Sequence, residues 1–206
     1  MTQATITHSD QIKRLLHELK LYGLYDQFQQ RVEQAVAAAQ HPLDFLRTVL
    51  EDEKLHRKNI VAKRLDLKAK FSHESSIEDW DTSYDRGITK QKLRELASLQ
   101  FASNKESLII YGKTGEGKTH LAIALGKRLC ENGISVVFYS TNLLFEEVQA
   151  QRASGKYLKF LKDLHRATVI IFDDFGLRNH THEEATILMD ILENRYRKGI
   201  SIITSQ

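Results

Sequence analysis

The sequence predicts an α/β protein with a parallel sheet, preceded by an all-helical N-terminal region. Three observations support this fold class. The first half of the 206-residue chain has helical periodicity, four apolar runs alternate with helical stretches from residue 107 onward, and a glycine-rich loop joins the first of these runs to a helix. A chain of this length forms one domain with an extension, or two small domains.

The N-terminal half contains three amphipathic segments whose apolar residues recur every three or four positions. Pro42, the single proline, is typical of a first helical turn, so we expect a third helix from Pro42 to about Lys70. The expected apolar faces are Ile12, Leu15, Leu16 and Leu19; then Phe28, Val32, Ala35, Val36 and Ala39; and finally Leu46, Val49 and Leu50.

A polar stretch, SHESSIEDWDTSYDRG, separates these helices from the rest of the chain. We therefore place a domain boundary between about residues 71 and 88, with a helical domain at 1–80 and the α/β core at 81–206. Within this stretch, Trp80 and Tyr84 are expected to anchor the linker to the core rather than to stack on bases.

The second half follows a strand–helix alternation that is typical of a parallel sheet. Thr89 is expected to cap a helix with Ile88 and Leu93 as a hydrophobic staple, and Thr181 with Glu184 has the capping-box spacing. The expected strands lie at 107–111, 134–140, 168–174 and 200–206, and the expected helices at 118–130, 142–153, 157–165 and from the Thr181 cap through Arg197.

The glycine-rich loop, GKTGEGKT, has the spacing Gly112-x-x-x-x-Gly117-Lys118-Thr119 of a phosphate-binding P-loop. Glycines let backbone N–H groups turn toward phosphates, and the following helix adds its positive N-terminal end. Lys118 is expected to contact the β- and γ-phosphates, whereas a simple turn between strand and helix is the alternative. The expected ATP-binding residues are Gly112, Lys113, Thr114, Gly115, Glu116, Gly117, Lys118, Thr119 and His120.

A pair of carboxylates follows the third apolar run, in the sequence VIIFDD. In this Walker B arrangement we expect Asp173 and the Thr119 hydroxyl to hold Mg²⁺, and Asp174 to orient the attacking water. The following Phe-Gly creates Asp-Phe-Gly and Asp-x-x-Gly patterns, but the other kinase and GTPase motifs are missing from the sequence. The alternative is a strand that ends in solvated turn residues.

A run of basic residues lies in the predicted third helix, against a single acid, Asp66. Such a run binds DNA phosphates through counterion release, without reading the base sequence, or else forms an ordinary solvated helix face. The candidate DNA-binding residues are Lys54, Arg57, Lys58, Lys63, Arg64, Lys68 and Lys70.

The composition excludes several other classes of protein. The single cysteine, Cys130, allows no disulfide framework and is expected to be a small buried residue. No N-terminal signal sequence and no apolar stretch of membrane-spanning length is found, so we expect a soluble, cytoplasmic protein without a membrane partner. The formal net charge of +3 says little about nucleic acid.

Several segments together resemble the IstB family, the helper ATPases of bacterial insertion-sequence transposition, which are related to DnaC and DnaA. These segments are LLHELKLYGLYDQFQ, GKTGEGKTHLAIALG, VIIFDDFGL and IITSQ. The resemblance covers nearly the whole chain. It implies a P-loop NTPase core of the AAA+ type with strand order 5-1-4-3-2. It also implies a homo-oligomer that assembles on double-stranded DNA with ATP and presents that DNA to a transposase.

By analogy with AAA+ ATPases, a polar residue after the last strand is expected to sense the γ-phosphate. Gln206 is the candidate, with Thr204 or Ser205 as alternatives, so the expected catalytic residues are Lys118, Asp174 and Gln206.

The sequence also departs from the family pattern. Asp174 stands where relatives usually carry Glu, which puts the rate of hydrolysis in question. The chain stops at its fourth strand, so we expect the C-terminal edge strand, the helical lid and the arginine finger to be absent, as in a truncated product, a fragment or a degenerate gene. Arg178, Arg195 and Arg197 are not assignable as that finger from sequence.

Two other functions fit the same motifs. One is a DnaC-like helicase loader whose N-terminal helices recognise a replicative helicase. The other is an ATP-gated binding module that does not hydrolyse the nucleotide. Partner capture distinguishes the first alternative from transposition, and phosphate release measured with DNA present tests the second.

Overall fold

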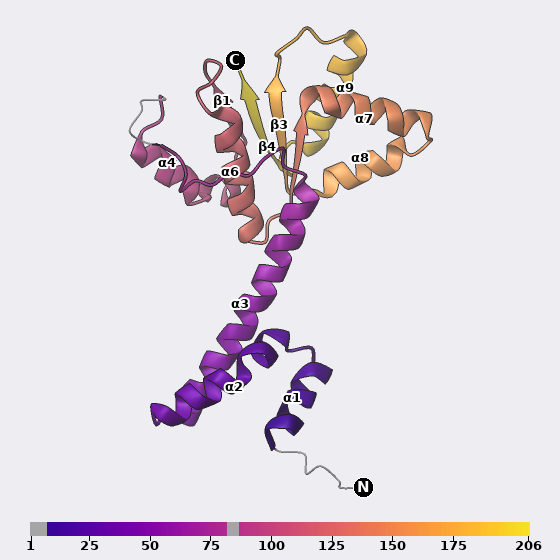
Figure 1. Cartoon of the computed structure of the whole chain (residues 1–206). Helices are drawn as coiled ribbons and strands as arrows, with labels where there is room; N and C mark the ends of the chain where they lie inside the picture. Colours follow the sequence, from indigo (N-terminus) through magenta and orange to yellow (C-terminus); the bar gives the residue numbers. More distant parts are fainter. Residues whose placement is uncertain (1–7, 82–86) are drawn as a thin grey trace. The chain divides into compact units, whose positions relative to one another are not determined.

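The computed structural model describes residues 8–81 and 87–206, and the chain divides into two compact units, Met1–Val61 and Ala62–Gln206. We call them the N-terminal unit and the C-terminal unit; Figure 1 labels most of their elements. The elements are α1 (His8–Glu18), α2 (Tyr22–Ala37), α3 (Pro42–Ala69), α4 (Lys90–Ala97), α5 (Gln100–Ser103), β1 (Leu108–Tyr111), α6 (Lys118–Glu131), β2 (Val136–Ser140), α7 (Thr141–Ala153), α8 (Tyr157–Arg166), β3 (Val169–Phe175), α9 (His182–Arg195) and β4 (Ile200–Ser205).

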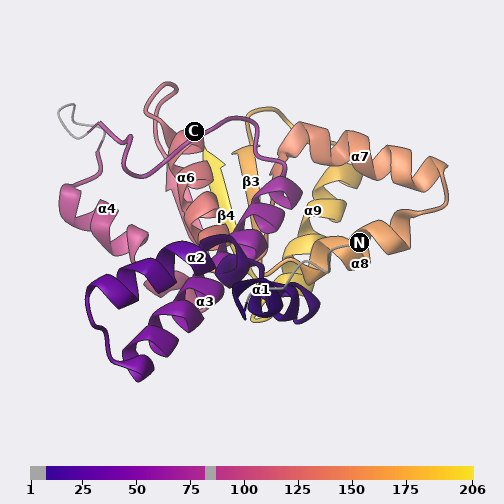
Figure 2. The same cartoon turned by 60° about the horizontal axis from the view of Figure 1, so that its bottom comes forward.

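The N-terminal unit consists of α1, α2 and most of α3, which are indigo and purple in Figure 2. Its small core contains Leu16, Leu24, Phe28 and Val49. Each predicted apolar face thus contributes one buried residue, but most of the other predicted positions are exposed, including Leu15, Leu19, Val36, Leu46 and Leu50. The prediction was wrong for these because the small core of this unit covers only a narrow line along each helix.

Glu53 of α3 fixes the start of α2. Its buried carboxylate accepts the backbone N–H groups of Gly23 at 2.8 Å and Leu24 at 3.2 Å, and Arg57 donates to it at 2.7 Å. Burial alone raises the pKa of Glu53, but these hydrogen bonds outweigh it and lower the pKa. A side chain at Gly23 would overlap His56, so this close approach of the two helices requires glycine.

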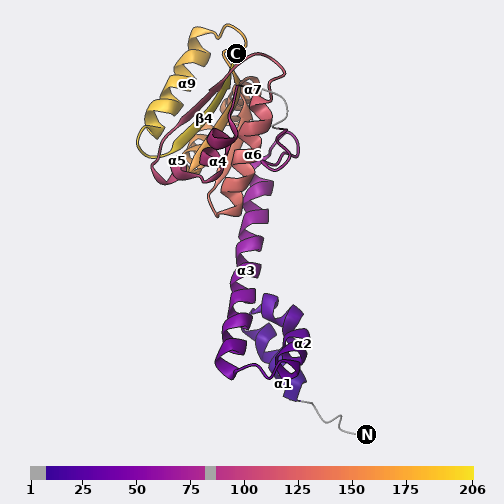
Figure 3. The ribbon, with the colours of Figure 1, turned by 90° about the vertical axis from the view of Figure 1, so that its left-hand side faces the viewer.

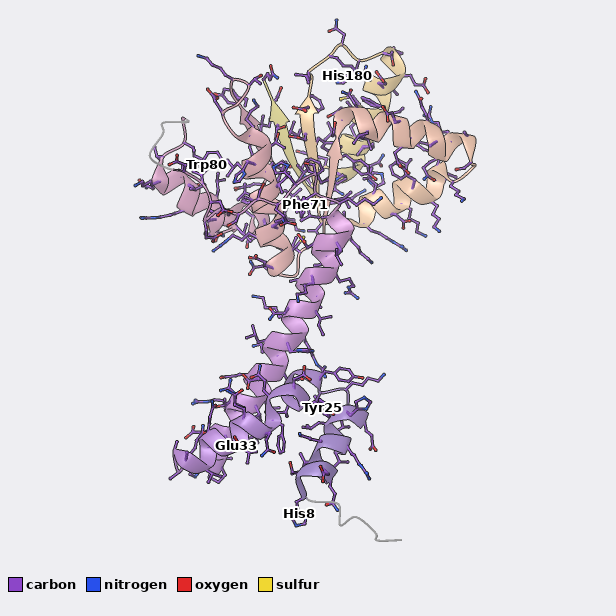
Figure 4. The ribbon with its side chains drawn as sticks, in the orientation of Figure 1. His8, Tyr25, Glu33, Phe71, Trp80 and His180 are labelled. Atoms are coloured by element: carbon purple, nitrogen blue, oxygen red, sulfur yellow. The ribbon has the colours of Figure 1, made fainter. Side chains whose placement is uncertain are left out.

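The division between the units falls within α3. The predicted helix from Pro42 to about Lys70 is confirmed, and Lys70 ends it with a positive φ of 57°. The compact units do not divide at 80/81, because Ala69, Phe71 and Trp80 already pack into the core of the C-terminal unit. Phe71 and Trp80 are labelled in Figure 4. Trp80 therefore anchors the linker as expected, whereas Tyr84 lies outside the described residues.

The C-terminal unit contains a four-stranded parallel sheet in the order β1-β4-β3-β2. This agrees with the expected order for the four strands that the described chain contains. Parallel strands align their carboxyl ends, so β1, β3 and β4 all end at the same edge of the sheet. The loop after β1 and the acidic end of β3 therefore lie close together.

Helices cover both faces of this sheet, with α6 on one side of β4 and α9 on the other (Figure 3). Because side chains alternate along a strand, Val169 and Ile171 of β3 belong to the core on the α6 side of the sheet, whereas Ile170 and Phe172 belong to the core with α7, α8 and α9. All four residues are buried, as expected for a parallel sheet that is covered on both faces. Cys130 is a buried residue of α6, and burial raises the pKa of its thiol to about 12.

The two predicted helix caps are present. The Thr89 side chain accepts the Lys92 N–H, and Thr181 with Glu184 forms a complete capping box at the start of α9. The helix after this box ends at Arg195 rather than at the predicted Arg197. Arg197 has a φ of 62°, a left-handed conformation that terminates a helix.

Arg195 connects α9 to the start of two strands. Its side chain is 2% exposed and donates to the carbonyls of Ala167 (2.8 Å), Thr168 (2.9 Å) and Ile200 (3.0 Å). Burial lowers the pKa of Arg195 to about 10, so the guanidinium remains charged at neutral pH. The missing side chain of Gly199 leaves the space that the guanidinium occupies. Arg195 is therefore a structural residue, which excludes it as an arginine finger for another subunit.

We predict that Arg195→Met lowers the free energy of unfolding by about 3–5 kcal/mol, because several buried carbonyls lose a charged donor. Arg166→Met is the matched control, since Arg166 is exposed and pairs with Asp163 on the same helix. We expect this control to change stability by less than about 0.5 kcal/mol. Urea unfolding measures both variants, and equal stabilities would contradict the structural role of Arg195.

Candidate functional site

The P-loop lies between β1 and α6, at the carboxyl edge of the sheet. Gly115 and Gly117 have φ values of 86° and 88°, a left-handed conformation that favours glycine. Gly117 directly precedes Lys118, the first residue of α6. The N-terminal N–H groups of this helix therefore face the loop, as an anion-binding site requires.

Lys118 lies across the loop. Its Nζ donates to the carbonyl of Gly112 at 2.8 Å and to that of Lys113 at 2.9 Å. The amine is thus held at the position from which it can reach an anion in the loop. The side chain of His120 instead lies 3.2 Å from the Ser76 carbonyl in the linker, so any contact of His120 with phosphate would come from its backbone.

Asp173 lies in β3 and connects this strand to α6, the helix after the P-loop, and to β4. Its side chain is nearly buried, and its Oδ1 accepts the hydroxyl of Thr119 at 2.9 Å and the hydroxyl of Thr204 at 2.5 Å. The Asp173 carbonyl also accepts the Thr141 hydroxyl at 2.9 Å. These hydrogen bonds place the two predicted metal-binding residues, Thr119 and Asp173, side by side.

Asp174 adopts an unusual backbone conformation next to this buried carboxylate. Its φ is 55°, and the pairing of β3 with β4 is irregular between Phe172 and Phe175. Such a bulge redirects a side chain out of the strand. Burial, followed by the charge of Asp173, raises the pKa of Asp174, while Lys118 partly opposes the shift. Asp174 therefore lies within the electrostatic reach of both partners.

Thr204 is the polar residue of β4 that contacts the acidic pair. It is fully buried, donates to Asp173, and accepts the backbone N–H of Asp174 at 3.0 Å. Ser205 donates instead to the Phe175 carbonyl at 2.9 Å, and Gln206 follows the strand in an exposed position. The geometry therefore favours Thr204, an alternative of the sequence analysis, over Gln206, whose sensor role stays a prediction.

A cavity of about 350 Å³ adjoins the loop, within the size range of small-ligand sites. Tyr111 lies on its wall with 82% of its surface exposed, so it belongs to the cavity rather than to the core. Sequence reasoning missed the contribution of α4, because nothing in a local pattern shows which helix folds over the loop. The lining residues are Trp80, Gly87, Ile88, Lys92, Leu96, Leu108, Ile109, Ile110, Tyr111, Glu116, Lys118 and Leu121.

Arg178 was also missed as a site residue. Its Nε donates to Asn142 of α7 at 2.7 Å, and its two terminal nitrogens donate to Glu184 of α9 at 3.0 and 2.7 Å. These hydrogen bonds hold the loop after Asp174 between two helices. The Arg178 hydrogen bond is the main cause that lowers the pKa of Glu184 to about 2. His180, labelled in Figure 4, lies in the same loop with its ring against Phe145.

The predicted DNA-binding residues are exposed, and both units contribute to them. In the N-terminal unit Lys54 and Lys58 are exposed, but the charge of Arg57 is paired with Glu53. In the C-terminal unit the exposed Arg64 and Lys68 lie one helical turn apart, whereas Lys63 is rotated about 100° from Arg64. The seven residues thus do not form one uniform strip, and their role in DNA binding stays a prediction.

Within 8–81 and 87–206, no helix is both long enough and apolar enough to cross a bilayer.

The fold and site together define a P-loop nucleotide-binding protein of the AAA+ type, in which the phosphate loop, the hydrogen-bonded Thr119–Asp173 pair and the adjacent acid Asp174 lie at one sheet edge. Residues 14–206 match the family described as IstB-like ATP binding protein, and the chain belongs to this family.

Relatives of the chain are assigned as ATP-binding proteins of insertion sequences. One, from Mycobacterium tuberculosis, is 30% identical, and the match covers 93% of this chain and 76% of the relative's length. Another, from Pseudomonas fluorescens, is also 30% identical and covers the whole chain and 87% of its own length.

Solved structures show the same fold. The DnaC helicase loader has a TM-score of 0.55 and 25% identity over 64% of this chain and 77% of its own. DnaA from Aquifex aeolicus, bound to AMPPCP, has a TM-score of 0.56 and 17% identity over 66% of this chain and 44% of its own.

We predict that Asp174→Asn raises the melting temperature more at pH 7 than at pH 4. A carboxyl whose pKa is raised in the folded state contributes stability below its unfolded pKa, and this contribution is lost as pH rises through the folded pKa. At pH 7 the wild-type protein therefore retains the destabilising charge that the variant lacks.

The pH dependence separates this charge effect from the backbone effect. Asn tolerates the left-handed conformation of residue 174 well, so the substitution also adds stability through the backbone. This gain in stability is the same at both pH values. Asp190→Asn, at an exposed position of α9, is the control. Thermal melts by circular dichroism measure all three proteins, and a pH-independent gain in Asp174→Asn would contradict the raised pKa.

Proposed function

We propose that this protein hydrolyses ATP with Mg²⁺ and uses the cycle to control its assembly on DNA. The observation that carries the proposal is the hydrogen-bonded set Thr119–Asp173–Thr204–Asp174, which joins the P-loop helix to the acidic end of β3. A glycine-rich connection without this set would bind no metal and orient no water.

The residues present fit a magnesium ion. The Thr119 hydroxyl and the Asp173 carboxylate are hard oxygen ligands, and they lie 2.9 Å apart at the end of the loop. We infer that these two residues hold the ion. When bound, Mg²⁺ neutralises charge on the β- and γ-phosphates.

Each remaining side chain has a distinct task in the proposed reaction. Lys118 exchanges its two carbonyl partners for phosphate oxygens and stabilises the negative charge of the transition state. Asp174 accepts a hydrogen bond from the attacking water and orients it toward the γ-phosphate. Thr204 holds the backbone of Asp174 and the carboxylate of Asp173 in fixed positions relative to each other.

We infer from the relatives that the ATPase serves insertion-sequence transposition. Proteins 30% identical to this chain carry names that place them in insertion sequences. In this proposal the protein forms an oligomer on double-stranded DNA, and the oligomer supports a transposase. The helices of residues 1–80 contact either the DNA or the partner protein.

A second candidate is a helicase loader. The likeness to DnaC favours it, since the match reaches 25% identity over 64% of this chain. The two candidates share the ATPase and differ in the partner protein. Capture with purified transposase and with purified replicative helicase distinguishes them.

We predict that Lys118→Ala weakens ATP binding by about 10- to 100-fold, because a charged donor is lost from the loop. Asp174→Asn is expected to retain ATP binding but to lower kcat by at least about 10²-fold, because the water is no longer held by a carboxylate. Fluorescence titration measures binding, and phosphate release in the presence of DNA measures turnover. Binding without release in the wild-type protein would instead support the non-hydrolysing module.

We predict that replacing Arg64 and Lys68 together by Gln reduces the salt dependence of DNA binding. The plot of log K against log salt concentration has a negative slope, and each lost phosphate contact reduces the magnitude of that slope by about 0.9. The control replaces Lys90 and Arg94 of α4 by Gln, because this exposed pair has the same spacing and the same charge. Fluorescence anisotropy with a DNA duplex measures the slopes. Equal slopes in the two double variants would remove Arg64 and Lys68 from the DNA interface.

A further inference from the structure

Glu116 places a carboxylate inside the phosphate-binding loop. Its Oε2 accepts the backbone N–H of Lys113 at 2.8 Å, across the turn that the two residues close. Glu116 is half-buried and occupies the last variable position of the loop, directly before Gly117. An anion-binding loop thus directs one of its own N–H groups to an acidic side chain.

The carboxylate also lies close against Gly112. A Cβ atom built on Gly112 would overlap the same Oε2, so the acid occupies the space above this glycine. The Lys118 amine contacts the carbonyls of Gly112 and Lys113, the same two residues that Glu116 touches. Glu116 and Lys118 both line the 350 Å³ cavity beside the loop. The acid is therefore part of the cavity wall at the point where the cavity meets the phosphate loop.

We propose that Glu116 sets the affinity of the loop for nucleotide by opposing the polyphosphate electrostatically. The inference rests on the proposed ATP site and concerns how tightly that site binds. A bound triphosphate carries several negative charges, and a carboxylate a few ångströms away lowers its affinity. Glu116 has to leave its position above Gly112, or be repelled there, when a nucleotide enters.

A purely structural role for Glu116 gives the opposite result. If its hydrogen bond to Lys113 mainly holds the loop in its binding conformation, loss of the side chain weakens nucleotide binding. Glu116→Gln separates the two effects, because the amide oxygen still accepts the Lys113 N–H while the charge is gone. Glu116→Ala removes both and serves as the second variant.

The test titrates ATP with Mg²⁺ into the full chain and follows the fluorescence of Trp80. Trp80 is the single tryptophan of the sequence, and it lines the cavity. We expect Glu116→Gln to bind ATP about three- to tenfold more tightly than the wild-type protein at low salt. The gain shrinks as ionic strength rises, because salt screens the repulsion. Glu116→Ala is also expected to bind more tightly.

Glu106→Gln is the matched control. It makes the same change in net charge at an exposed residue of the turn that precedes β1, and we expect its affinity to equal that of the wild-type protein. Equal or weaker ATP binding by both Glu116 variants, with a wild-type protein that does bind ATP, overturns this inference alone. A wild-type protein and variants that all fail to bind ATP overturn the proposed function as well.

Discussion

The buried carboxylate of Asp173 is the constraint on which the site depends. An anion that is 5% exposed is costly unless donors surround it, and the hydroxyls of Thr119 and Thr204 supply them. These donors come from α6 and β4, which are far from β3 in the sequence. These hydrogen bonds therefore hold the first turn of the P-loop helix against two central strands, so that the P-loop, the Thr119–Asp173 pair and Asp174 meet at one edge of the sheet.

The strained backbone next to Asp173 lies at Asp174, a residue with a proposed chemical role. Asp174 has a positive φ, which is unfavourable for a residue other than glycine, and its burial and the charge of Asp173 disfavour the ionised carboxylate and raise its pKa. The surrounding structure holds it there through Thr204 on one side and through the Arg178 contacts to α7 and α9 on the other. Stability is thus lower at the residue that the proposed hydrolysis needs most, while Arg195 and the covered sheet supply a rigid frame.

The two units differ in what they can contribute. The C-terminal unit has an extensive core and carries the P-loop and the acidic pair. The N-terminal unit has a small core, and its eight Lys and Arg residues balance its eight Asp and Glu residues. The excess of basic residues in the chain therefore lies in the C-terminal unit, which includes the last turns of α3. The exposed leucines of α3 in the N-terminal unit are better suited to a protein surface than to phosphates.

The sequence by itself determined the strands, most helix ends, the loop and the acidic pair, because hydrophobic periodicity, glycine spacing and caps such as Thr89 and Thr181 are local signals. The tertiary structure alone decided that Thr204 rather than Gln206 contacts the acids, that α4 forms a wall of the cavity, and that Arg195 is buried. It also decided which leucines of the N-terminal helices are covered. These features depend on contacts between segments far apart in the chain. The local sequence around a residue does not indicate which distant segment it contacts.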